Sequence, residues 1–199
     1  MRIQEIKDAM SKFSTFRARM DFCKENFDYV AGGTGRKVFD IGNGMALKLG
    51  CNRKGIDQNF VESDYGLSRM YPDLLNPTFD NCDDGHWMIV PLLEKISKKD
   101  LVNHVGMDLR EMDIFLRGME DERRGKATRI NWDQIEENEV MSQVMDLVFN
   151  TTLLTGDWSR MSSWGRDPQT NSLRIIDWGL DQQVYDKHYS FNRHAALAY

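Results

Sequence analysis

The chain has 199 residues, of which 41% are hydrophobic and 29% charged, and its formal net charge is −5 at pH 7. This is the composition of a globular protein with one large domain or two small lobes. The acidic balance argues against a general nucleic-acid binder. The sequence shows neither a signal-peptide core nor an apolar run of membrane length. The three cysteines and four histidines are scattered and have no metal-binding spacing. An odd number of cysteines fits a reducing cytoplasm, so we expect a cytoplasmic protein without zinc.

The first 26 residues are expected to form an N-terminal amphipathic helix. Apolar residues recur at helical spacing from Ile6 to Phe16, with lysines and arginines between them. We predict one helix over residues 3–24 that packs through this stripe.

A glycine-rich stretch follows a predicted strand at residues 27–30. Gly33 and Gly35 lie in the segment Gly32-Gly33-Thr34-Gly35, which removes side chains where the backbone must approach another group. Free N–H groups in such a loop can cradle phosphate. A flexible hairpin tip is the alternative explanation.

The next two predicted strands form a hairpin. Residues 38–41 lead into Gly42-Asn43-Gly44, a strong hairpin signal, and residues 45–49 return. Alternation along the second strand places Ala46 and Lys48 on one face. Ala46 would leave room for a flat base and Lys48 would reach its phosphates. The alternative is an exposed surface lysine.

A helix and two more strands complete the predicted sheet lobe. The apolar stripe from Ile56 to Met70 predicts one helix, with Glu62 beside the stripe. Glu62 could pair with Lys48 or be one more solvated acid. Strands are predicted at residues 75–81 and 86–90, so residues 27–93 form a small antiparallel lobe.

The pattern becomes helical after Pro91-Leu92-Leu93-Glu94, which is the predicted lobe boundary. Ser97 and Asp100 predict a helix-capping box. A charge-rich loop is expected at residues 120–126, and a long helix from Asn131 to a terminating Gly156. Residues 94–199 are therefore predicted to form a mainly helical lobe.

Two aspartates stand out in this second lobe. Asp157 directly follows the predicted long helix, and Asp177 follows a short apolar strand at residues 173–176. A strand that holds one carboxylate at its end suits a Mg²⁺ ligand, since Mg²⁺ prefers oxygen donors. The alternative is an ordinary turn, in which Asp and Gly are common.

Taken in order, these motifs resemble the protein-kinase fold, in particular the small kinase-like proteins of tailed bacteriophages. The resemblance covers residues 27–180 and implies an α+β, two-lobed fold with a small antiparallel sheet lobe and a truncated helical lobe. It implies a loop over ATP at Gly33 and Gly35, a lysine strand at Ala46 and Lys48, a helix glutamate at Glu62, a catalytic base at Asp157, and metal ligands at Asp177 and Ser162.

The sequence also departs from the kinase pattern. No His or Arg precedes Asp157 at the usual positions, and a serine stands where the second metal ligand, an Asn, is expected. After Gly179 there is no room for a long activation segment. Two functions remain open: a minimal phosphotransferase that uses ATP and Mg²⁺, and a pseudokinase that binds a host or virion protein. A plain α+β domain with chance motifs is the third possibility. Under the kinase interpretation, Lys48, Glu62, Asp157 and Asp177 converge on one cleft.

Overall fold

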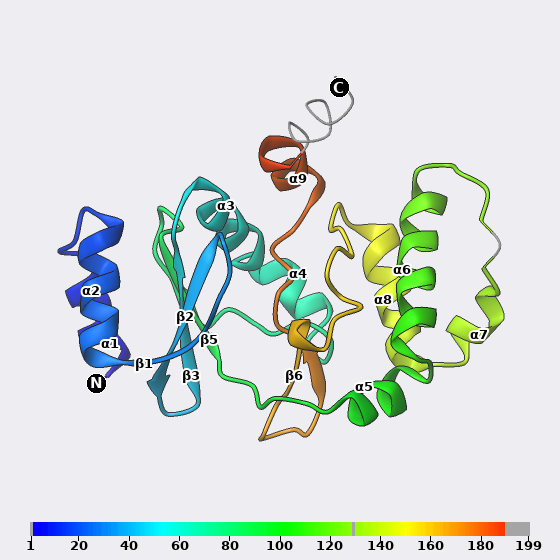
Figure 1. The fold of residues 1–199 in the computed structure, drawn as a ribbon, viewed down its shortest axis with the longest axis horizontal. Helices are drawn as coiled ribbons and strands as arrows, with labels where there is room; N and C mark the ends of the chain where they lie inside the picture. Colours follow the sequence, from blue (N-terminus) through cyan, green and yellow to red (C-terminus); the bar gives the residue numbers. More distant parts are fainter. Residues whose placement is uncertain (1, 129, 190–199) are drawn as a thin grey trace. The chain divides into compact units, whose positions relative to one another are not determined.

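The computed structural model describes residues 2–128 and 130–189. Its helices are α1 (Ile3–Met10), α2 (Phe16–Asn26), α3 (Arg53–Glu62), α4 (Tyr65–Met70), α5 (Lys98–Val105), α6 (Leu109–Arg123), α7 (Trp132–Glu136), α8 (Glu139–Asn150), the 3-10 helix η1 (Met161–Ser163) and α9 (Gln182–His188). Its strands are β1 (Asp28–Gly32), β2 (Arg36–Gly42), β3 (Met45–Gly50), β4 (Asp80–Asn81), β5 (Trp87–Pro91), β6 (Trp164–Arg166) and β7 (Leu173–Ile175). The protein is therefore α+β (Figure 1). Among the described helices, none has the length and apolar character needed to cross a membrane.

The chain divides into two compact units. The first contains the residues up to Tyr65 together with Pro77–Leu92. The second contains Gly66–Asn76 and the chain from Leu93 onward. The N-terminal helices thus belong with the sheet. Residues 66–76, which the sequence pattern assigns to the sheet lobe, belong to the second unit.

The first unit is built on a five-stranded antiparallel sheet in the order β1-β2-β3-β5-β4. The β2–β3 turn has positive φ at Gly42, Asn43 and Gly44, as its sequence predicts. In the register, Val38 and Met88 lie opposite Lys48 on its two sides. Since side chains alternate along a strand, even-numbered residues of β2, β3 and β5 share one face.

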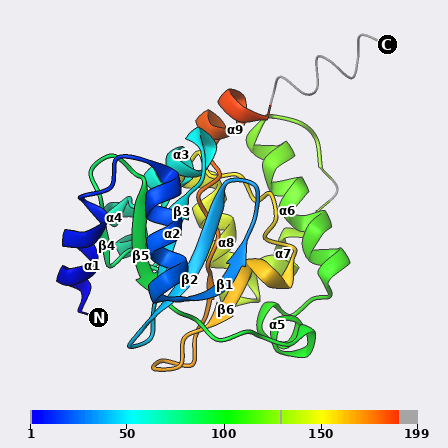
Figure 2. The ribbon, with the colours of Figure 1, turned by 60° about the vertical axis from the view of Figure 1, so that its left-hand side comes forward.

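The odd-numbered face of this sheet carries the hydrophobic core of the unit. Helices α1 and α2 lie on this face, and α3 lies on the opposite side of the sheet (Figure 1 and Figure 2). The core joins buried residues of the two helices to those of the strands: Ile6, Met10, Cys23, Phe39, Ile41, Leu47, Leu49, Trp87 and Ile89. One face is therefore filled by packing, and the even-numbered face holds the candidate site.

Two helices predicted as continuous are divided in the structure. A single helix over residues 3–24 is wrong, because Thr15 Oγ1 accepts a hydrogen bond from the Ala18 N–H at 3.2 Å and caps α2. The helix predicted from Ile56 to Met70 breaks after Glu62, where the Ser63 hydroxyl donates to the Phe60 carbonyl at 2.9 Å. Serine and threonine bond to nearby backbone and compete with a continuing helix.

The strand predicted at residues 75–81 is mostly wrong. Leu75 forms a parallel bridge with Ile175 in the second unit, and the Asn76 N–H donates to the Ile175 carbonyl at 2.9 Å. Only Asp80–Asn81 (β4) joins the five-stranded sheet. The backbone bonds of the earlier residues are taken by a strand one hundred residues away, which no local pattern reveals.

The second unit contains helices α5 to α9 and the antiparallel pair β6–β7. The predicted capping box at Ser97 and Asp100 is confirmed. The loop predicted at residues 120–126 is wrong in its first half, because α6 continues through Arg123 and an i,i+4 ion pair joins Glu120 to Arg124.

The long helix predicted from Asn131 to Gly156 is also divided. It forms α7 and α8, and the Asn138 side chain caps α8 by accepting from the Met141 N–H at 2.9 Å. Helix α8 packs against α6 and ends at Asn150, not at Gly156 (Figure 1). Gly156 instead has a φ of +35° in the turn that leads to Asp157.

Candidate functional site

A buried ion pair joins Lys48 of β3 to Glu62 at the end of α3. Lys48 Nζ donates to Glu62 Oε2, and the two residues are 6% and 1% exposed. Glu62 is further fixed through its main chain, since the Thr78 hydroxyl donates to its carbonyl at 2.6 Å. Because both groups are buried, the alternative interpretations of Lys48 as a surface lysine and of Glu62 as a solvated acid are wrong. The structure therefore brings together two of the residues that the kinase resemblance pairs.

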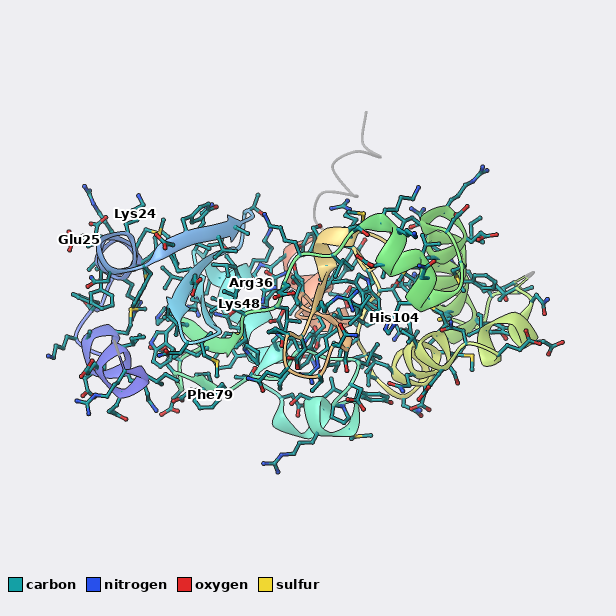
Figure 3. The ribbon with its side chains drawn as sticks, turned by 90° about the horizontal axis from the view of Figure 1, so that it is seen from below. Lys24, Glu25, Arg36, Lys48, Phe79 and His104 are labelled. Carbon is teal, nitrogen blue, oxygen red and sulfur yellow. The ribbon has the colours of Figure 1, made fainter. Side chains whose placement is uncertain are left out.

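Arg36 is a second cation on the same carboxylate. Its Nη1 lies 2.8 Å from Glu62 Oε1, and its side chain is only 9% exposed. Figure 3 labels Arg36 and Lys48 on neighbouring strands of the sheet. The sequence analysis missed Arg36. The available signal was its even number in β2, which places it on the Lys48 face.

Ala46 lies in a small apolar cluster on the face that carries Lys48. Its buried neighbours in this cluster are Met88 and Val90 of β5, and Val38 and Leu92 pack against them. Ala46 has the smallest side chain of this cluster. An apolar cluster of this kind suits a flat apolar group. Because the side chains are buried, such a group would have to replace the protein atoms that now cover them.

The glycine loop is attached to the start of α3. The Gly35 carbonyl accepts from the Cys51 N–H at 2.7 Å, and Asn52 Nδ2 donates to the Thr34 carbonyl at 2.8 Å. A Cβ atom at Gly55 would lie 1.9 Å from the Gly35 oxygen, so glycine is required there by close packing. The loop is therefore held by α3 and is not a free hairpin tip.

Two N–H groups of this loop remain available as donors. Gly33 uses its N–H for the Arg36 carbonyl at 3.0 Å, and a Cβ at Gly33 would meet no atom within 4 Å. In the described part of the chain, the N–H groups of Thr34 and Gly35 have no acceptor. An anion beside the loop could accept from both.

In the second unit, the segments that carry Asp157 and Asp177 are bonded to each other. Trp158 Nε1 donates to the Asp177 carbonyl at 3.3 Å, and Trp158 and Trp178 are buried. The Ser163 hydroxyl donates to the Asp157 carbonyl at 2.9 Å, and the Ile176 N–H donates to the Ser163 carbonyl at 2.8 Å. Both aspartates are exposed, so buried tryptophans fix the backbone while the carboxylates face outward.

Asp157 forms an ion pair that the sequence analysis did not predict. Arg160 Nη1 lies 3.1 Å from Asp157 Oδ1, and the two side chains are 68% and 57% exposed. Ser162, the predicted metal ligand, is exposed in η1, whereas its neighbour Ser163 is buried. A pair this exposed contributes little to stability, but it places a positive charge beside the candidate base.

The cysteines offer no alternative chemistry. Burial raises the pKa of the Cys23 and Cys82 thiols to about 12 and also raises that of Cys51, so all three are protonated at neutral pH. Over residues 2–128 and 130–189, no three His, Cys, Asp or Glu side chains are grouped so as to hold a metal ion. Mg²⁺ usually takes one or two protein carboxylates together with substrate phosphates, so Asp177 still fits that ion.

The structure thus groups the predicted residues in two sets. In the first unit, Lys48 and Ala46 share one sheet face, and Glu62 of α3 pairs with Lys48. In the second unit, Asp157 and Asp177 lie on segments that are bonded to each other. The convergence of the two sets on one cleft stays a prediction.

Comparison with known proteins finds similarities among solved structures. The sequence matches no family model and no curated protein. Among solved structures, the chain is similar to SAICAR synthase from Saccharomyces cerevisiae, complexed with SAICAR, at 12% identity and a TM-score of 0.39. The match covers 86% of this chain and 85% of that chain. A similarity at this level assigns neither a family nor an activity.

Proposed function

We propose that this protein is a kinase-like nucleotide-binding protein that takes ATP with Mg²⁺ and acts as a minimal phosphotransferase. The observation that carries the proposal is the buried Lys48–Glu62 pair on the sheet face beside Ala46 and the glycine loop. Burying a lysine and a glutamate is costly, and replacing such a pair by apolar residues is often neutral or stabilising. The presence of this costly pair in a small sheet therefore favours a functional role.

The residues of the first unit fit the parts of ATP. The base would pack against Ala46 and Val38, both apolar and on the Lys48 face. Lys48, oriented by Glu62, would donate to the phosphates, and the N–H groups of Thr34 and Gly35 would donate to the same oxygens. The ligand would thus have its apolar end on the cluster and its charged end under the loop.

The residues of the second unit would serve the transfer step. Asp177 would hold Mg²⁺, with Ser162 as a weaker oxygen ligand, and the ion would neutralise charge on the phosphates. Asp157 would accept the proton of an acceptor hydroxyl at a carboxylate oxygen. Arg160, 3.1 Å from Asp157, would keep that carboxylate oriented.

A second candidate is a pseudokinase that binds a partner protein without catalysis. The Asp157–Arg160 pair favours it, because Arg160 Nη1 already occupies one oxygen of the carboxylate that an acceptor hydroxyl would have to reach. The resemblance to phage proteins implies a host or virion protein as the partner. This candidate needs no transfer of phosphate and no Mg²⁺.

Calorimetry with ATP, in the presence and absence of Mg²⁺, tests the proposal. We expect binding that Mg²⁺ strengthens, and we expect Lys48→Met to weaken it by about 10-fold or more, since a hydrogen bond to a charged group is worth about 1.5–3 kcal/mol. Lys24→Met is the matched control, because Lys24 is exposed on α2 at the opposite face of the sheet (Figure 3). Absence of ATP binding to the unmodified protein would refute the proposal.

A further inference from the structure

Arg36 occupies a position that the proposed function does not use. It begins β2 directly after the glycine loop, and its carbonyl accepts the Gly33 N–H at 3.0 Å. Its side chain runs past the start of α3, where its Cγ would lie 3.2 Å from a Cβ atom at Gly55. The guanidinium then reaches Glu62. Arg36 therefore connects the base of the loop to the carboxylate that holds Lys48.

Two buried cations share one carboxylate at this point. Glu62 Oε1 accepts from Arg36 and Oε2 accepts from Lys48. Because both oxygens belong to one carboxylate, the ammonium and guanidinium groups lie next to each other. This places two positively charged groups side by side next to the glycine loop, which Arg36 directly follows.

Adjacent cations are what a polyphosphate requires. Its oxygens carry several negative charges along a short chain, so more than one positively charged donor can bind it at once. The loop N–H groups of Thr34 and Gly35 stand immediately before Arg36 in the chain and have no acceptor among the described residues. Loop donors, Arg36 and Lys48 thus form one continuous set of donors on the same side of the sheet.

We propose that Arg36 is a second phosphate-binding residue of the nucleotide site, held by Glu62 in the same way as Lys48. This inference rests on the proposed function, since it names a further residue for the same ligand. It predicts that Arg36 acts on the phosphates and not on the base. It also predicts that positive charge at position 36 matters more than the shape of the side chain.

The test compares ATP, adenosine and inorganic tripolyphosphate as ligands in calorimetry. We expect Arg36→Met to weaken ATP and tripolyphosphate binding by about 10- to 100-fold, the worth of one charge-assisted hydrogen bond. Adenosine binding should stay within about 2-fold. Arg36→Lys should recover most of the loss, because it restores the charge. In Arg36→Met, Glu62 keeps Lys48 as a partner, so no carboxylate is left buried alone.

The outcomes separate this inference from the proposed function. If the unmodified protein binds no ATP, the proposed function fails and takes the inference with it. If it binds ATP and Arg36→Met binds as tightly as the control Lys24→Met, the inference alone is refuted. An equal loss for adenosine and ATP would mark Arg36 as structural and would also refute it. Persistent weakening in Arg36→Lys would contradict the role of charge.

Discussion

At the scale of single residues, Glu62 is the point where β2, β3 and α3 meet. Its two carboxylate oxygens hold Arg36 and Lys48, and it is almost completely buried. Removing one member of a buried ionic group typically costs about 3–5 kcal/mol, because the remaining charges lose their compensation. The carboxylate is therefore more sensitive to substitution than either cation.

We expect Glu62→Gln to lower the free energy of unfolding by about 3 kcal/mol, measured by urea denaturation. The amide keeps the shape of the side chain but removes the negative charge between two cations. Glu25→Gln is the control, since Glu25 is exposed on α2 (Figure 3) and the same change there should alter stability by less than about 0.5 kcal/mol. A loss for Glu62→Gln as small as that of the control would show that the ion pairs contribute no net stability.

At the scale of elements, the residue at which α8 ends sets the length of the segment that leads to Asp157. Arg123 of α6 donates through Nη1 to the carbonyls of Val148, Thr151 and Leu153, at 2.9, 2.9 and 2.8 Å. These carbonyls belong to the last turn of α8 and to the residues that follow it, where the helix itself supplies no N–H donor. Arg123 thus ends the helix at Asn150, several residues before Gly156.

We expect Arg123→Met to destabilise the protein by about 2 kcal/mol, because buried carbonyl groups lose a charged donor. Arg124→Met is a close control: Arg124 is the next residue and is exposed, and its side chain makes a long 3.5 Å contact with Glu120. Thermal unfolding should show a clearly lower midpoint for the first variant and almost none for the second. Equal midpoints would mean that water satisfies these carbonyls.

The errors in the predicted elements have two physical origins, a single capping residue and a partner distant in the sequence. Signals confined to a few adjacent residues were read correctly, as in the Gly42-Asn43-Gly44 turn and the Ser97 capping box. The helix breaks at Thr15 and Asn138 were missed because each cap is one polar residue inside an unbroken apolar stripe. The end of α8 was missed because its partner, Arg123, lies 25 to 30 residues upstream.

At the scale of the whole molecule, the candidate site was predictable only as far as local geometry reaches. Strand alternation was enough to place Ala46 and Lys48 on one face. The position of Glu62 beside the apolar stripe of its helix was enough to suggest its pairing with Lys48. The third partner, Arg36, could be placed on the Lys48 face by strand alternation, but its contact with Glu62 could not be predicted, because it depends on how α3 crosses the sheet. Likewise, the bond between the two aspartate segments depends on the burial of Trp158.

The proposed transfer reaction uses side chains of both units, and two substitutions in the second unit separate its steps. Asp157→Ala should lower ADP formation from ATP by about 10²–10⁴-fold, the usual worth of a positioned base. It should leave ATP affinity nearly unchanged, because Asp157 is proposed to contact the acceptor. Asp177→Ala should instead remove the part of ATP affinity that depends on Mg²⁺ and leave binding without Mg²⁺ intact.

The physical reason for expecting a metal lies in the pairing of the two acidic segments. Trp158, the residue after Asp157, donates through Nε1 to the Asp177 carbonyl at 3.3 Å, so the two segments are bonded to each other. If their carboxylates face one substrate, they would repel unless a cation stands between them. Arg160 already neutralises part of the charge at Asp157, so the Mg²⁺ dependence should follow Asp177 and not Asp157. Asp121→Ala serves as the control, since that half-buried acid on α6 forms an ion pair with Lys126 at 2.8 Å and has no proposed role in the reaction. If neither Asp157→Ala nor Asp177→Ala differs from this control, phosphate transfer is excluded and the pseudokinase stands.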